Sequence, residues 1–285
     1  MARKKRPLPQ DLQLPCIGVD THAHLDLEPL ASEIEACLTR ARQSGLAAIG
    51  NVFLGSTAYT RNKDLFAEVP WVFFILGTHP HEAAAVDVDE LERITQALDS
   101  DPRIKAFGEI GLDFYWDRSP RDRQREAFQA QLELARSKEI PVVIHSRDAE
   151  AETLNILLDM GFQDRPLLWH CFGGGEDAAV RILKQGWTLS IPGTVTYKNN
   201  PDLQAAVRTI PLERMVLETD CPFLAPEPYR GKRNEPAFTA FTAQTIAKLR
   251  QEPVLRIWEE TARTARDFFT IDQTGRSVQP AAGLV

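Results

Sequence analysis

Short apolar runs that end in histidine or in an acidic residue recur along this chain of 285 residues. Four runs are followed by histidine (in IGVDTHAH, VFFILGTHPH, PVVIHS and PLLWHCF), and two are followed by acids (in IKAFGEIGLD and RMVLETDCP). The first four contain every histidine of the chain, namely His22, His24, His79, His81, His145 and His170. Parallel strands of a barrel bring their carboxyl ends to one face. The recurrence therefore predicts a parallel barrel with its functional site at that face.

The segments between these runs have helical spacing of apolar residues, so strands and helices alternate along the chain. We expect strands at 16–20, 47–53, 71–76, 104–107, 141–144, 166–169, 187–191 and 215–218. We expect helices at 29–44, 56–68, 89–100, 121–138, 149–160, 176–185, 201–208 and 236–249, with a further helix at 252–269 left over. Eight strand–helix units predict a single-domain (β/α)8 TIM-like barrel of the α/β class over residues 16–270.

The two ends of the chain are expected to lie outside this barrel. Residues 1–15 begin with a basic stretch and are interpreted as a disordered extension, although a nucleic-acid-binding arm remains an alternative. Residues 271–285 contain few apolar side chains and are expected to form a loose tail.

Composition excludes some classes of function. The net charge of −7 argues against non-specific binding of nucleic acid over the whole surface, but it leaves room for a local basic cleft. We expect no secretion signal and no membrane span, because neither pattern of apolar residues occurs. The four cysteines have no CxxC spacing and are interpreted as reduced thiols of a cytoplasmic protein. We expect a monomer.

The spacing of the histidines points to metal binding. His22 and His24 are two residues apart, so on a strand both imidazoles face the same side and can hold one cation. Asp220 ends the eighth strand, beside the first, where it can ligate the same cation and accept a proton from water. His145 and His170 end neighbouring strands, about 4.8 Å apart, and can share a second cation. A carboxylate at Glu109 can bridge the two.

Mixed histidine and carboxylate ligands suit Zn, Mn or Fe, with Mg bound more loosely. We therefore expect two divalent cations, with Mg, Mn or Zn as the candidates, and we assign catalytic roles to Asp220 and Glu109. Such a pair of cations polarises a substrate oxygen and lowers the pKa of water.

Other residues near the strand ends are candidates for substrate contacts. His79 and His81 can bind a phosphate or ligate a further metal, or they can have a structural role at the rim. Arg147 can pair with a phosphate or with an acid such as Asp148. The remaining candidates each have an alternative: Tyr115 and Trp116 can stack on a base or pack their loop, and Arg230 and Lys232 can form an anion-binding rim or a solvated loop.

Several motifs together resemble those of the TatD-type metal-dependent deoxyribonucleases, a branch of the amidohydrolase-like barrel superfamily. They are DTHAHLD, GTHPHE, GEIGLDFYW, PVVIHSRDA, HCFGG, ETDCPFL and RGKRNEP, in the order expected of that family, between residues 19 and 249. The resemblance implies a TIM-like barrel, divalent metals and cleavage of phosphodiesters at the 3′ end of DNA. By motif position it implies metal ligands at His22, His24, Glu109, His145, His170 and Asp220. It also implies that Glu109 bridges the metals, where many amidohydrolases use a modified lysine.

The functional prediction is therefore a metal-dependent 3′-to-5′ exonuclease, with DNA 3′ ends or single strands as partner and no membrane. A hydrolase of small esters, lactones or amides is the alternative, because the same metals activate water toward a carbonyl carbon. A metal-binding module without catalysis would leave Glu109 and Asp220 as an unexplained excess of acids.

Overall fold

The computed structural model describes residues 6–116 and 118–276. Eight parallel strands form one sheet in sequence order, which is the topology expected of the barrel. The strands are β1 (Gly18–Ala23), β2 (Leu46–Leu54), β3 (Val72–Gly77), β4 (Ile104–Asp113), β5 (Val142–Arg147), β6 (Leu167–Trp169), β7 (Thr188–Ile191) and β8 (Met215–Leu217). The barrel nearly closes where Ala23 of β1 bridges to Cys221, just after β8. The expected (β/α)8 fold is thus confirmed.

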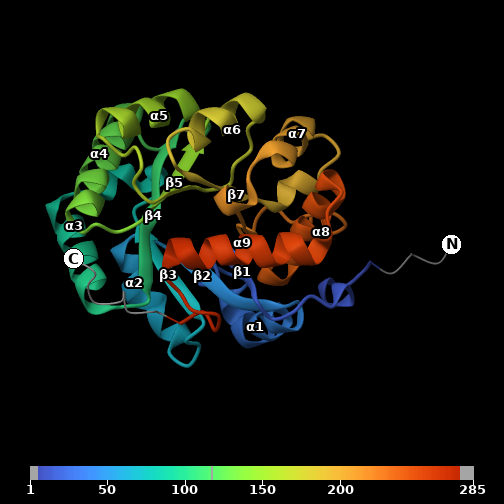
Figure 1. Ribbon diagram of the computed structural model, residues 1–285. Helices are drawn as coiled ribbons and strands as arrows, with labels where there is room; N and C mark the ends of the chain where they lie inside the picture. The colour runs from blue at the N-terminus through green and yellow to red at the C-terminus, as the bar shows by residue number, and fades with distance from the viewer. Residues whose placement is uncertain (1–5, 117, 277–285) are drawn as a thin grey trace, which may run out of the picture.

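Helices follow the strands and surround the sheet, as Figure 1 shows. Within the described chain the α-helices are α1 (Ile34–Gln43), α2 (Ser56–Asn62), α3 (Val88–Ser100), α4 (Arg121–Ser137), α5 (Glu150–Asp159), α6 (Glu176–Leu183), α7 (Pro201–Thr209), α8 (Thr239–Arg250) and α9 (Val254–Phe269). None of these helices is both long and apolar enough to cross a membrane. The four cysteines are all free thiols.

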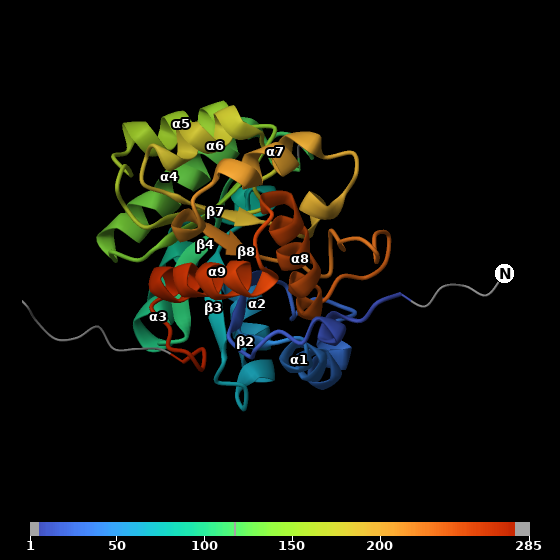
Figure 2. The same cartoon turned by 45° about the vertical axis from the view of Figure 1, so that its right-hand side comes forward.

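The helix left over by the sequence pattern, α9, covers the amino-terminal end of the barrel (Figures 1 and 2). Ala262, Ala265 and Phe269 of this helix join one buried cluster with barrel residues such as Val19 and Phe73. The helix approaches β1 so closely that a Cβ atom on Gly18 would lie 1.9 Å from the Trp258 ring. Because α9 fills this end, the opposite end is the one available for a site.

The two terminal segments differ from expectation where the structure describes them. Residues 6–15 pack on the barrel rather than lying free: the Trp258 indole N–H donates to the Pro15 carbonyl, and Leu12 contacts the cluster around Phe238. At the other end, Ile271 is buried with α9, and Gly275 lies against Ala48. The expected disorder of residues 1–5 and the loose tail from 277 lie outside the described residues.

Strand β4 is longer than its apolar run suggested, and this extension carries site residues. The sequence predicts an end at residue 107, but β4 continues to Asp113 with an irregular register between Phe107 and Ile110. A Cβ atom on Gly111 would lie 2.0 Å from the His145 carbonyl oxygen, so glycine is needed for β4 to pair with β5 there. As a result Glu109 and Asp113 are fixed within the sheet rather than in a loop.

Candidate metal centre

Glu109 lies at the centre of the carboxyl-terminal end of the barrel and is buried. Its Oε1 atom lies 3.5 Å from Nε2 of His22 and 3.5 Å from Nε2 of His24, both on β1. Its Oε2 atom lies 3.1 Å from Nδ1 of His145 on β5 and 3.3 Å from Nε2 of His170, just after β6. Each carboxylate oxygen therefore faces its own pair of histidines, one pair on either side of Glu109.

The Asp220 carboxylate lies beside the pair formed by His22 and His24. Its Oδ1 atom lies 3.4 Å from Nε2 of His24 and 3.9 Å from Nε2 of His22. The Asp220 backbone N–H donates to the His22 carbonyl, which ties the end of β8 to β1. Asp220 has a left-handed conformation with φ of 55°, which aspartate tolerates better than most residues. The turn thus aims this carboxylate back over the barrel.

The buried polar atoms of this cluster fit a cation. Both ring nitrogens of His22 are buried without a hydrogen-bond partner, an arrangement that costs free energy unless something else binds them. Two ligand atoms bound to one cation at about 2.1 Å in tetrahedral geometry lie about 3.4 Å apart. The separations of 3.4 to 3.5 Å between His24 or His22 and the carboxylates match that spacing. The donor set therefore fits a divalent metal.

Three of the four histidines have an oxygen acceptor on the nitrogen that points away from Glu109. These contacts join His24 Nδ1 to the Val52 carbonyl at 3.2 Å, His145 Nε2 to Asp113 at 3.2 Å, and His170 Nδ1 to Glu218 at 3.1 Å. An acceptor at the far nitrogen places the ring proton there and leaves the lone pair of the near nitrogen for a metal. Asp113 and Glu218 are therefore placed to orient the rings of His145 and His170.

The ionisable groups of the cluster make cation binding depend on pH. Burial raises the pKa of the Glu109 carboxyl, but His170, His22 and His79 outweigh it and hold this pKa well below its ordinary value. Burial lowers the pKa of His24 and His145, but the neighbouring carboxylates raise both to about 9. Protons therefore compete with a cation for these two rings, and metal affinity should fall as the pH falls.

His79 and His81 lie beside this cluster, at the start of a short 3-10 helix (Pro80–Ala85). The His81 backbone N–H donates to Nδ1 of His79 at 3.1 Å, so the proton of a neutral His79 ring is on Nε2. Burial, and then the charge of His145, hold the pKa of His79 well below 6.5. His81 Nε2 lies 2.9 Å from the Asp113 carboxylate. His79 is thus a neutral hydrogen-bond donor rather than a metal ligand through Nδ1.

The basic side chains that were predicted to contact the substrate lie in different surroundings. Arg147 lies two residues beyond His145 at the end of β5, and its guanidinium lies over the Tyr115 ring. The Arg230 guanidinium lies 4.0 Å from the centre of the Tyr197 ring and donates a hydrogen bond to the Asn199 side chain. Lys232 is exposed. A role for Arg230 and Lys232 in binding substrate therefore stays a prediction.

The sequence did not reveal the roles of Glu218 and Asp20. Glu218 lies two residues before Asp220, a spacing that could have suggested a shared side of the strand. Asp20 accepts hydrogen bonds from the Thr219 backbone N–H at 2.9 Å and from its hydroxyl at 2.6 Å, which joins β1 to the end of β8. Burial raises the pKa of Asp20 to about 8. Asp20 thus fixes the spacing between the His22 and Asp220 segments.

Two buried glutamines of α4 hold the loops that carry the site. Gln131 accepts from the Thr78 N–H at 2.8 Å and donates to the Thr78 carbonyl at 3.0 Å. Gln124, seven residues earlier on the same helix face, makes the same pair of bonds with Asp113 at 2.8 and 3.0 Å. Because Thr78 precedes His79, this helix positions both the histidine pair and the acid that orients His145.

Replacement of Gln131 by leucine should therefore loosen the site. Gln131→Leu keeps the volume but leaves a buried N–H and a buried carbonyl of Thr78 unpaired, at a cost of about 1–3 kcal/mol each. We expect a lower free energy of unfolding and lower turnover, with little change in bound metal. Urea unfolding, kinetics and metal analysis measure the three effects. Gln163→Leu, at an exposed position, is the matched control and should leave all three unchanged.

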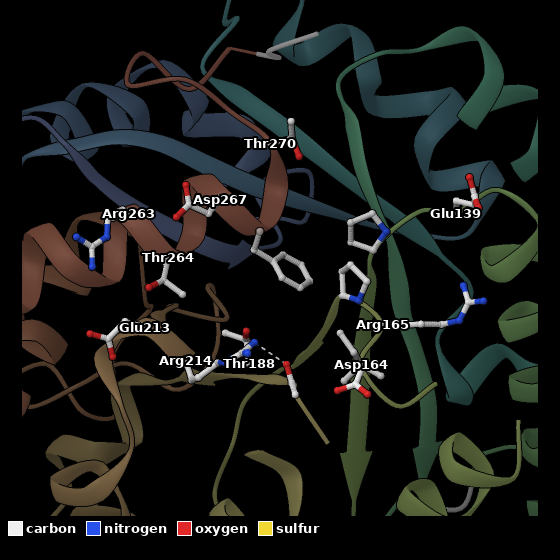
Figure 3. Close-up of a pocket in the computed structure, with 15 residues that line it drawn as sticks. Glu139, Asp164, Arg165, Thr188, Glu213, Arg214, Arg263, Thr264, Asp267 and Thr270 are labelled. Atoms are coloured by element: carbon white, nitrogen blue, oxygen red, sulfur yellow. Dashed lines mark hydrogen bonds between the residues drawn. The ribbon is translucent and has the colours of Figure 1, made fainter. Parts of the chain in front are cut away.

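A separate cavity of about 710 Å³ lies at the other end of the barrel, beside α9. Figure 3 shows Arg263, Thr264 and Asp267 projecting from this helix around it. Its walls also include residues at the starts of β5, β6 and β7, such as Pro166 and Thr188, so it is remote from the strand ends that carry the histidines. This cavity does not contribute to the metal centre.

The strand ends of this barrel bring together the buried donor atoms of four histidines and two carboxylates. This fold and this site define a metal-dependent hydrolase. The model of the family described as TatD related DNase matches residues 19–270. The chain belongs to the TatD family of metal-dependent hydrolases.

Individual relatives agree with this assignment. The chain is 36% identical to the metal-dependent hydrolase YabD of Bacillus subtilis over 253 residues, covering 89% of this chain and 99% of the relative. It is 34% identical to the metal-dependent hydrolase YcfH of Escherichia coli over 258 residues, covering 89% and 96%. The crystal structure of YjjV, a TatD homologue from Escherichia coli, superposes with a TM-score of 0.84 at 29% identity, covering 90% of this chain and 99% of that one.

Proposed function

We propose that this protein is a two-metal phosphodiesterase that removes nucleotides from the 3′ end of DNA. The observation that carries the proposal is the position of Glu109, whose two oxygens face two separate groups of histidines. A carboxylate so placed can bridge two cations, and paired cations are a recurrent solution for phosphodiester hydrolysis. The family description as TatD related DNase supports the same substrate class.

The bound cations would lower the pKa of water and neutralise charge on a phosphoryl oxygen. His22, His24 and Asp220 would hold one of them, and His145 and His170 the other, with Glu109 shared. The Asp220 side chain keeps 15% of its surface exposed, whereas that of His22 is fully buried. The side chain of Glu109, the other carboxylate, keeps only 4% exposed. Asp220 is thus the more accessible carboxylate, and it would orient the attacking water and accept its proton.

His79 can bind the substrate through its Nε2 proton. A neutral donor of this kind can bond to a phosphoryl oxygen without adding charge that would repel the cations. Its ring lies 4.4 Å from that of His145, centre to centre, so a phosphate bound near His145 would be within its reach. This role takes the first of the three alternatives that the sequence left open.

A metal add-back assay tests the proposed function. The protein is stripped of metal, reloaded separately with Mg, Mn or Zn, and incubated with a 5′-labelled single-stranded oligonucleotide and with a neutral lactone. A ladder of products shortened one nucleotide at a time, abolished by chelator, is the expected result. Lactone turnover with intact DNA would instead favour the small-ester hydrolase.

A further inference from the structure

Two large aromatic side chains are exposed at the rim of the metal centre. Tyr115 and Trp116 follow β4 directly and keep 53% and 50% of their surfaces accessible. Their rings lie 5.1 Å apart, centre to centre, in an edge-to-face arrangement. Such exposure argues against the alternative that the two rings only pack their own loop.

The backbone below these rings is tied to the metal centre through one carboxylate. Oδ1 of Asp113 accepts the backbone N–H groups of both Tyr115 and Trp116 at 3.0 Å. Oδ2 of the same residue contacts His145 and His81. The two aromatic residues are therefore held at a fixed place relative to a metal-ligand candidate.

The guanidinium of Arg147 lies beside the same rings. Arg147 pairs in register with Asp113 on the adjacent strand, and its two-residue spacing from His145 puts it on the same side of β5. Its guanidinium lies 3.9 Å from the centre of the Tyr115 ring and 5.7 Å from that of Trp116. Among the residues that the structure describes, no carboxylate forms a salt bridge with Arg147, and its side chain is exposed.

We propose that Tyr115, Trp116 and Arg147 form a subsite for one unpaired nucleotide beside the reacting phosphodiester. The base stacks on one ring and contacts the other, which stands nearly perpendicular to the first, and the Arg147 guanidinium takes the adjacent phosphate. The inference rests on the proposed function, because the subsite serves that same centre. A paired base inside a duplex has both faces covered by its neighbours, and a terminal base pair holds its base against its partner, so the subsite selects single-stranded or frayed 3′ ends.

Abasic substrates test the stacking directly. Single-stranded oligonucleotides carry one abasic residue at each of the last three positions in turn, so the phosphates stay and one base is lost. With the metal-loaded enzyme, we expect one position to lower kcat/KM about tenfold. In Tyr115→Ala and Trp116→Ala the normal substrate should fall to the level of the abasic one, and the abasic substrate should be unaffected.

Salt dependence tests Arg147. Arg147→Ala should weaken normal and abasic substrates alike and reduce the slope of log affinity against log salt by about one. Arg256→Ala, on an exposed residue of α9 at the other end of the barrel, is the matched control and should keep the slope. Leu255→Ala controls for the loss of an exposed apolar side chain.

A binding measurement separates this proposal from the proposed function. The metal-loaded protein is titrated with an oligonucleotide whose phosphorothioate linkages resist cleavage, while tryptophan emission is recorded. Quenching that disappears in Trp116→Phe supports the subsite even if no DNA is cleaved, which would refute only the exonuclease. Equal treatment of normal and abasic substrates by the wild-type enzyme, or equal losses on both in the aromatic variants, would overturn the subsite.

Discussion

Replacement of Glu109 by glutamine is expected to lower kcat/KM by about 10³-fold or more, equivalent to about 4 kcal/mol of transition-state stabilisation. The amide keeps the shape of the side chain but removes its negative charge and one of its two acceptor oxygens. Because each oxygen faces a different pair of histidines, one substitution should weaken both halves of the centre. Metal analysis of the purified variant should show substantially less bound metal than the wild type.

Glu218→Gln is the matched control for this experiment. Glu218 is as deeply buried as Glu109, and among the described residues its carboxylate hydrogen-bonds to the far nitrogen of His170 rather than lying between the two pairs of histidines. Loss of such an orienting partner typically costs about 10- to 100-fold in metal affinity or activity. If Glu109→Gln were no more damaging than Glu218→Gln, Glu109 would not be the shared ligand.

Replacement of Asp220 by asparagine is expected to lower kcat by about 10²- to 10⁴-fold with a smaller change in KM. Burial raises the pKa of Asp220, but the hydrogen bond with His24 and the nearby histidine charges bring it below its ordinary value, so the carboxylate is ionised near neutral pH. Asparagine keeps one oxygen for a metal but cannot accept the proton of water. Steady-state kinetics, together with the metal content of the variant, measure the effect.

Asp164→Asn controls for the backbone at that position. Asp164 has a left-handed conformation with φ of 58°, close to that of Asp220, and lines the cavity at the opposite end of the barrel. Asparagine tolerates this conformation as well as aspartate does, so neither variant should unfold. Near-normal turnover in Asp220→Asn with intact metal binding would remove Asp220 from the reaction.

The barrel and its cluster of histidines could be predicted because both follow from short-range patterns. Alternating strands and helices predict the fold, and the two-residue spacing of His22 and His24 predicts that they share a side of β1. The structure brings together all six residues interpreted as metal ligands. Their identity as ligands rests on this geometry and on the family.

Features that depend on contacts between distant segments could not be predicted. The roles of Asp113 and Glu218 require the orientation of the His145 and His170 rings, which no local pattern contains. The packing of α9 against the barrel end depends on the close approach of Trp258 to Gly18. Arg230 stands in a basic stretch of sequence, but its contacts with Tyr197 and Asn199 come from a segment about 30 residues earlier.

A measurement of the number and position of the bound metals tests the proposed two-metal centre most directly. Crystals of the protein soaked with Mn or Zn would be measured for anomalous scattering at the carboxyl-terminal end of the barrel. Two peaks, one between Glu109, His22, His24 and Asp220 and one between Glu109, His145 and His170, are the predicted result. A single peak on one side of Glu109 at saturating metal, in an enzyme fully active under the same conditions, would contradict it.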